Sequence, residues 1–183
     1  MISSKYFFAY CLDQGIKHMC GINMLAYLAS MNFCFKFKTD RLFNEDFIAY
    51  SCGPVIPSMH LSEFPDVQRL MPCEFNDRRS TGFYIRILDE LEYVLSDEKS
   101  NEVGIDSATM ICFFDVVLRT YWDDSNLLVI TPTFIWHPDG AWKKIYVKGE
   151  KNVISPEEIM VHYINVMGTH PEFTYSLIGI QEE

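Results

Sequence analysis

Histidine and cysteine side chains are where this sequence could bind a metal ion or place a nucleophile beside a base. The chain has five histidines, at positions 18, 60, 137, 162 and 170, and six cysteines, at positions 11, 20, 34, 52, 73 and 112. No two cysteines stand in the C-x-x-C spacing that is typical of zinc and redox sites. His137 and Asp139 flank Pro138, but no third ligand follows at a recognisable offset. The sequence therefore predicts no metal site and no cofactor.

The sequence motifs of common enzymes are also absent from the chain. There is no Walker A, G-x-G-x-x-G, H-E-x-x-H or G-x-S-x-G motif. Asp123 and Asp124 are adjacent and do not share a helix face, which favours a solvated helix end over an acid–base pair. His162 shares an expected helix face with Ile159 and Val166, which predicts a buried, hydrogen-bonded ring. We therefore expect no catalytic residue and a protein that is not an enzyme; a metal- or cysteine-dependent enzyme is the least favoured alternative.

The chain of 183 residues carries a formal net charge of −10. Acids and bases balance in residues 1–85, and the acidic excess lies in residues 86–106 and 107–183. Nucleic-acid binding needs a basic face that neutralises phosphates, so we expect no nucleic-acid partner. No segment resembles a membrane span or a signal peptide. The cysteines are scattered through apolar segments, which favours a reducing compartment and a cytoplasmic protein.

The elements that must position these side chains are mostly helices, because apolar residues recur with helical spacing behind capping residues. The expected helices cover residues 3–15, 17–32, 45–52, 57–64, 85–95, 107–122 and 155–168. The strongest pattern belongs to the helix at 107–122, whose apolar face consists of Met110, Phe113, Phe114, Val117, Leu118 and Tyr121. Residues 65–82 are expected to be irregular and 172–183 extended, and 125–150 fits either a helix or strands.

A glycine and two prolines at residues 53–57, in the string GPVIP, interrupt the helical pattern. Asn44 is placed to cap a helix over 45–52, and Gly53 can adopt the left-handed conformation that ends it. Pro54 cannot continue that helix, whereas Pro57 suits the first turn of the next one. We therefore expect a helix–turn–helix corner in a single domain over residues 1–183. The predicted fold is mainly α, with α+β as the alternative and with a few short strands or extended segments.

The order of several motifs along the chain resembles the Panacea domain family. The matching positions are Leu25, Tyr27 and Ala29; Phe43, Ile48, Ala49, Gly53, Pro54, Val55 and Pro57; Leu127, Leu128, Thr131 and Trp142; and Ile154, Ile159 and Tyr163. The chain departs from the family where Asn23-Met24 replaces a lysine, where Tyr50 replaces a common tryptophan, and where Thr131-Pro132 replaces a Thr-His pair. The resemblance spans nearly the whole chain, and the GPVIP block is its most specific part.

This resemblance implies a non-catalytic module that neutralises a cognate toxin by direct contact, in a family that also includes proteolysis-adaptor antitoxins. Interfaces of this kind are anchored by aromatic residues, and the candidates here are Tyr50, Trp122, Trp136 and Trp142. The alternative function is a phage or mobile-element inhibitor of a host defence nuclease, whose acidic surface would mimic nucleic acid. For either function we expect the partner to be a protein and not a membrane. Self-association of the chain is left open.

Overall fold

The computed structural model describes residues 1–16, 18–59, 78–96, 104–122 and 135–169. Within these ranges the fold is mainly helical with one small antiparallel sheet, as predicted. The helices are α1 (Ser4–Asp13), α2 (Met19–Phe37), the 3-10 helix η1 (Pro57–Met59), α4 (Arg78–Ser96), α5 (Ser107–Tyr121), α7 (Ala141–Ile145) and α8 (Pro156–Thr169). The strands are β1 (Phe47–Tyr50), β2 (Gly53–Val55) and β3 (Val153–Ile154), in the order β2-β1-β3.

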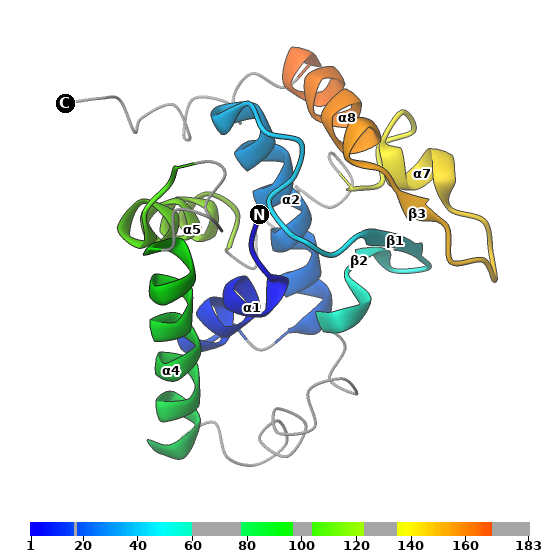
Figure 1. Cartoon of the computed structure of the whole chain (residues 1–183). Helices are drawn as coiled ribbons and strands as arrows, with labels where there is room; N and C mark the ends of the chain where they lie inside the picture. The colour runs from blue at the N-terminus through cyan, green and yellow to red at the C-terminus, as the bar shows by residue number, and fades with distance from the viewer. Residues whose placement is uncertain (17, 60–77, 97–103, 123–134, 170–183) are drawn as a thin grey trace.

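Helix α2 is the centre of the arrangement in Figure 1. Helices α1, α4 and α5 gather on one side of α2, and the sheet, α7 and α8 lie on the other. The apolar residues Ile22, Leu25, Ala26, Ala29 and Phe33 of α2 are buried, and burial extends around the remaining faces of the helix as well. A helix that is apolar all round is stable only inside a core, so α2 must be covered from several directions.

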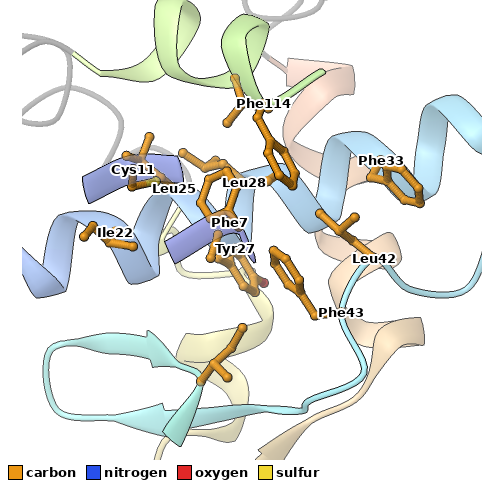
Figure 2. Close-up of a cluster of buried hydrophobic side chains, with 14 of the residues drawn as sticks. Phe7, Cys11, Ile22, Leu25, Tyr27, Leu28, Phe33, Leu42, Phe43 and Phe114 are labelled. Carbon is orange, nitrogen blue, oxygen red and sulfur yellow. The ribbon is translucent and has the colours of Figure 1, made fainter. Parts of the chain in front are cut away.

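Aromatic side chains join α1 and α5 across the core. Phe114 is fully buried on α5, and its ring meets the ring of Phe7 edge-to-face with 4.9 Å between centroids (Figure 2). Phe113, Val117 and Leu118 are buried on the same face of α5, as the spacing predicts. Asp106 caps this helix by accepting a hydrogen bond from the Thr109 backbone N–H at 2.7 Å. The predicted helix at 107–122 and its buried apolar face are confirmed.

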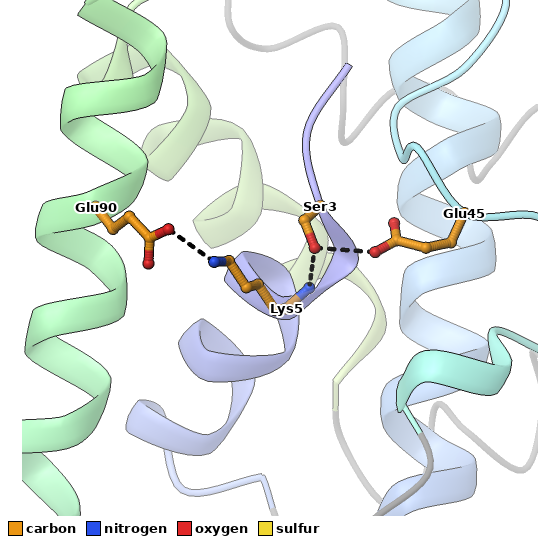
Figure 3. A network of polar contacts seen from close by, with 4 residues as sticks. All are labelled: Ser3, Lys5, Glu45 and Glu90. Carbon is orange, nitrogen blue, oxygen red and sulfur yellow. Dashed lines mark hydrogen bonds and ion pairs between the residues drawn. The ribbon is translucent and has the colours of Figure 1, made fainter. Parts of the chain in front are cut away.

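The start of α1 is held by both its own cap and a distant carboxylate. Ser3 is the N-cap, and its hydroxyl accepts from the Lys5 backbone N–H. The Glu45 carboxylate accepts hydrogen bonds from the Ser3 hydroxyl and from the Ser4 backbone N–H, both at 2.9 Å. Lys5 pairs with Glu90 of α4 at 2.8 Å (Figure 3). The negative Glu45 carboxylate lies at the positive end of the helix dipole and so stabilises the N-terminus of α1.

One other helix end follows a sequence rule closely, and two helices extend beyond their predicted bounds. Ser155 and Glu158 form the predicted capping box of α8, each side chain bonding the other residue's backbone N–H at 3.2 and 2.8 Å. Helix α4 begins at Arg78, seven residues before the predicted start at 85, so residues 78–82 are helical and the prediction of an irregular segment is wrong there. The helix at 17–32 likewise continues to Phe37.

The predicted helix over residues 45–52 is wrong, because this segment forms a β-hairpin. Strands β1 and β2 pair with Ile48 opposite Val55, and β1 also pairs with β3 through Phe47 and Ile154. Gly53 has the predicted positive φ, at 129°, but it follows a hairpin turn and does not end a helix. The expected helix–turn–helix corner is therefore a strand–turn–strand that leads into η1 at Pro57.

Pro54 fits the hairpin because β2 lies at the edge of the sheet, where a missing backbone N–H is tolerated. Asn44 does not cap a helix; its backbone N–H donates to the Ile2 carbonyl. The predictions for Asp123–Asp124, for residues 125–134, for Cys73, His60 and His170, and for the extended tail at 172–183 lie outside the described residues. No helix in the described ranges is long and apolar enough to cross a membrane.

Candidate partner-binding surface

Two of the predicted interface aromatics meet at the hairpin, but one of them is a core residue. Trp142 of α7 is only 7% exposed, and its indole N–H donates a 2.7 Å hydrogen bond to the Tyr50 carbonyl. Its ring stacks on Tyr146 with 5.1 Å between centroids. Trp142 therefore attaches α7 to the end of β1, and the expectation that this residue is an exposed anchor is wrong. Tyr50 itself is half-buried.

Trp136 remains accessible, with 48% of its surface exposed. The residue before it, Ile135, is fully buried, and a Cβ at Gly53 would lie 3.3 Å from the Ile135 Cγ2 atom. This contact fixes the backbone beside Trp136 against the hairpin. Trp122 is half-buried at the end of α5, where its ring packs against Gly21 in the first turn of α2. Of the predicted tryptophans, Trp136 has the exposure that an interface anchor needs.

Four exposed lysines stand in the same part of the chain as Trp136: Lys143, Lys144, Lys148 and Lys151. The Nζ atom of Lys151 lies 5.9 Å from the centroid of the Tyr50 ring, a cation–π distance. Residues 136–153 contain these four lysines and two acids, a net charge of +2. Since the whole chain carries −10, the remainder carries −12. This segment is thus a local basic region in an acidic protein.

We call this region the lysine–aromatic surface and define it by Tyr50, Trp136, Lys143, Lys144, Val147, Lys148, Lys151 and Val153. Val147 and Val153 are about as exposed as Trp136, which adds apolar area beside the charges. The lysines were not identified by sequence reasoning. Their spacing, K-K-x-x-x-K-x-x-K within the acidic half of the chain, is a signal that could have indicated them.

Backbone and amide hydrogen bonds hold the loop that carries these lysines. The Ala49 N–H of β1 donates to the Asn152 carbonyl at 2.8 Å. The Asn152 side-chain amide donates to the Ile145 carbonyl at 3.2 Å and to the Glu150 carboxylate at 2.9 Å. Loop residues 146–152 are therefore fixed to the sheet at one end and to α7 at the other. A fixed loop loses little conformational entropy when a partner binds.

A buried Tyr–His pair connects the layers beneath this surface. The His162 ring of α8 is buried, as predicted, and its Nδ1 lies 2.9 Å from the Tyr27 hydroxyl of α2. A Cβ at Gly140 would lie 3.1 Å from two atoms of the His162 ring, so this glycine allows the chain entering α7 to pass close to α8. Burial raises the pKa of Tyr27 well above its usual value. The pair acts as a structural link between α2 and α8.

The residues of the family-like motif build the hairpin. Ala49, Gly53, Pro54 and Val55 are buried, and Pro57 is half-buried at the start of η1. The element they form is a strand–turn–strand, whereas the sequence predicted a helix–turn–helix corner. His137 and Asp139 form a local turn, in which the Asp139 backbone N–H donates to His137 Nδ1 at 3.2 Å. Among the described residues, no group of three or more His, Cys, Asp or Glu side chains could hold a metal ion.

Comparisons with protein-family models, with curated proteins and with solved structures give no match for this chain. The resemblance to the Panacea domain thus rests on sequence motifs, and the lysine–aromatic surface rests on geometry and charge.

Proposed function

We propose that this protein is a stoichiometric protein-binding module, and that it is an antitoxin which covers the active surface of a toxin encoded beside it. The observation that carries the proposal is the lysine–aromatic surface, because residues 136–153 hold an exposed Trp136 and four exposed lysines in an otherwise acidic protein. The Panacea-like order of motifs supports the antitoxin class. The partner that fits this surface presents an apolar pocket with an acidic rim.

The energetic roles of the two residue types differ. An exposed tryptophan that becomes buried in a partner's pocket is a typical hot spot, at about 2–4 kcal/mol on truncation. The lysines stand where a solvated rim would be, and rim charges act mainly on the association rate and on its salt dependence. An ordinary specific interface covers about 800 Å² per partner, which leaves room for Tyr50 and the two exposed valines beside Trp136.

Co-expression with the neighbouring gene product and titration calorimetry of the purified pair test the proposal. We expect one partner per chain and neutralisation that is complete only near equimolar amounts. Trp136→Ala should weaken binding about 30-fold or more, which corresponds to about 2 kcal/mol. The double variant Lys143→Glu/Lys144→Glu should slow association and reduce its dependence on salt. Tyr93→Ala is the matched control, because Tyr93 is an aromatic residue on α4 that is 77% exposed.

Two outcomes would contradict the proposal. Neutralisation by a trace amount of this protein would indicate turnover of a substrate. Equal losses of affinity in the Trp136 and Tyr93 variants would place the interface elsewhere on the molecule.

A second candidate function uses the acidic side of the molecule. Asp89, Glu90 and Glu92 are exposed on α4, and Glu90 also pairs with Lys5. This acidic helix favours the alternative function, an inhibitor that occupies the basic cleft of a defence nuclease. In that case Asp89→Lys/Glu92→Lys would abolish inhibition of the nuclease, and the Lys143→Glu/Lys144→Glu variant would retain it.

A further inference from the structure

An apolar groove with acidic residues at its edge lies between the end of α2 and the start of α8. The groove has a volume of about 460 Å³, and its apolar lining consists of Cys34, Phe35, Pro156 and Met160. Phe35 is 39% exposed, and its ring meets the ring of Tyr163 on α8 with 4.9 Å between centroids. The groove is therefore an open side of the contact between the two helices.

The exposed face of α8 extends this groove along the helix. Glu157, Met160, Val161 and Ile164 stand at i, i+3, i+4 and i+7, so their side chains share one face. Val161 is 52% exposed and Ile164 is 58% exposed. Exposed apolar side chains that gather in one place mark interaction sites, whereas single ones do not. We call this region the α2–α8 surface and define it by Phe35, Asp40, Glu157, Met160, Val161 and Ile164.

The charge around the α2–α8 surface is opposite to that of the lysine–aromatic surface. Residues 38–46 and 155–160, which border the groove, contain five acids and two bases, a net charge of −3. Asp40 and Glu157 are exposed and line the groove itself. Residues 136–153 carry +2. Opposite charges on two surfaces favour their association and orient it.

The two bases beside the groove are engaged by neighbouring side chains. The Nζ atom of Lys38 lies 4.2 Å from the centroid of the Phe35 ring, a cation–π distance. Arg41 forms an ion pair with Asp46 at 3.3 Å. The two acids that line the groove therefore set the sign of the charge that a partner meets there.

Both surfaces are exposed in the same folded chain, so a contact between them requires two copies. They are also adjacent, because β3 carries Val153 and leads directly into α8, which packs along α2 (Figure 1). Adjacent complementary surfaces can meet twice around a two-fold axis, which gives a closed dimer. We propose that two copies of the chain form such a dimer, in which the lysine–aromatic surface of each copy lies on the α2–α8 surface of the other.

Each part of the lysine–aromatic surface has a counterpart in this dimer. Trp136 and the exposed valines cover the apolar groove, and the lysines face the carboxylates of Asp40 and Glu157. The dimer hides Trp136, so a toxin reaches the lysine–aromatic surface only after the dimer dissociates; this consequence rests on the proposed function. Self-association would then hold excess antitoxin in a form that the toxin must separate before it is neutralised.

Sedimentation velocity of the purified full chain, over concentrations from micromolar to millimolar, tests the dimer. We expect the mass to rise from one chain to two with increasing concentration, and salt to shift the equilibrium back toward one chain. Trp136→Ala and Ile164→Asp should each raise the dissociation constant at least about 10-fold, because each change is present at both contacts. Tyr93→Asp, at a 77% exposed site on α4, is the matched control and should dimerise as the wild type does.

A charge exchange tests which surfaces meet. The variants Lys143→Glu/Lys144→Glu and Asp40→Lys/Glu157→Lys should each fail to dimerise alone, because like charges then face each other at both contacts. An equimolar mixture of the two variants should restore a dimer, since one contact is then native and the other has both signs reversed. Circular dichroism checks that each variant is folded.

Three outcomes would overturn the proposal. A wild type that stays monomeric over the whole range excludes the dimer without any variant. Dimerisation that the charge variants leave unchanged, or a mixture that stays monomeric, would place the contact elsewhere. A monomeric wild type whose Ile164→Asp variant binds the toxin less tightly would assign the α2–α8 surface to the toxin instead. Because the chain is measured alone, failure of the dimer leaves the proposed function standing, and failure to bind a toxin leaves the dimer standing.

Discussion

Replacement of Tyr27 by phenylalanine removes one oxygen atom from the centre of the protein and leaves the aromatic ring in place. The ring keeps its edge-to-face contact with Phe47, at 5.3 Å between centroids, but the 2.9 Å hydrogen bond to His162 is lost. His162 is itself buried, so the hydrogen bond at its Nδ1 atom is lost inside the core. A buried polar atom in this state costs about 1–3 kcal/mol. For a chain of this size, the melting temperature should fall by about 2–12 °C.

A double-mutant cycle isolates the pair. His162→Leu should cost a similar amount, because it leaves the Tyr27 hydroxyl buried without its hydrogen bond to the ring. Tyr27→Phe/His162→Leu should cost less than the sum of the two single variants, by about 1–2 kcal/mol, since no polar group of the pair remains. Urea unfolding followed by circular dichroism measures all four free energies of unfolding. Tyr93→Phe, at a 77% exposed tyrosine, is the control and should change stability by less than about 0.5 kcal/mol.

Additive costs would refute this reasoning, because they would mean that the two side chains do not depend on each other. A Tyr27→Phe variant that is as stable as the control would refute it too, because the hydrogen bond would then make no net contribution.

Three further predictions concern the core, the hairpin and the buried tyrosines. Phe114→Ala should lower the free energy of unfolding by about 3–5 kcal/mol, because it empties a site that is fully buried; an unchanged urea midpoint would contradict the core assignment. Gly53→Val should cost more than about 1 kcal/mol, because φ is 129° and the new Cβ would press on Ile135 at 3.3 Å; Ser51→Val, in the neighbouring turn, is the comparison. Burial raises the pKa of both Tyr27 and Tyr121, so the folded state holds these protons more tightly than the unfolded chain does. Their contribution to the free energy of unfolding is complete below about pH 10. It declines above that pH, by up to about 1.4 kcal/mol per pH unit for each tyrosine. Tyrosinate absorbance should therefore show at least two groups that ionise only as the circular dichroism of the helices is lost; ionisation of all ten tyrosines near pH 10 in a folded protein would contradict this.

The helices were predictable because their signals are local. The caps at Ser3 and Asp106 and the capping box at Ser155 act within one helical turn, so the sequence reveals them. The hairpin was not predictable in this way. Glu45 and Asp46 stand where acids usually begin a helix, but the Glu45 carboxylate instead serves the start of α1. The partner that makes β1 a central strand lies about a hundred residues later in the chain, and local propensity cannot report a contact of that range.

The candidate site was predictable only in part, because it too depends on contacts between distant parts of the chain. Trp136 was identified from its residue type, but whether a tryptophan is exposed depends on tertiary packing. Trp142 was assigned to the surface and is instead fixed under the hairpin by Tyr50. Contacts of this kind exist only in the folded chain.

The pairing of β3 with β1 also sets an order of events during synthesis. The hairpin leaves the ribosome long before Val153 and Ile154 do, and until they arrive one edge of β1 has unpaired N–H and carbonyl groups. At ~5–20 residues per second this interval lasts roughly 5–20 s. An open strand edge accepts a strand from any neighbouring chain, so the interval is a hazard for aggregation. Closure of the sheet by β3 ends that hazard, and a chain truncated before residue 153 would keep the open edge by which chaperones and proteases can recognise it as unfinished.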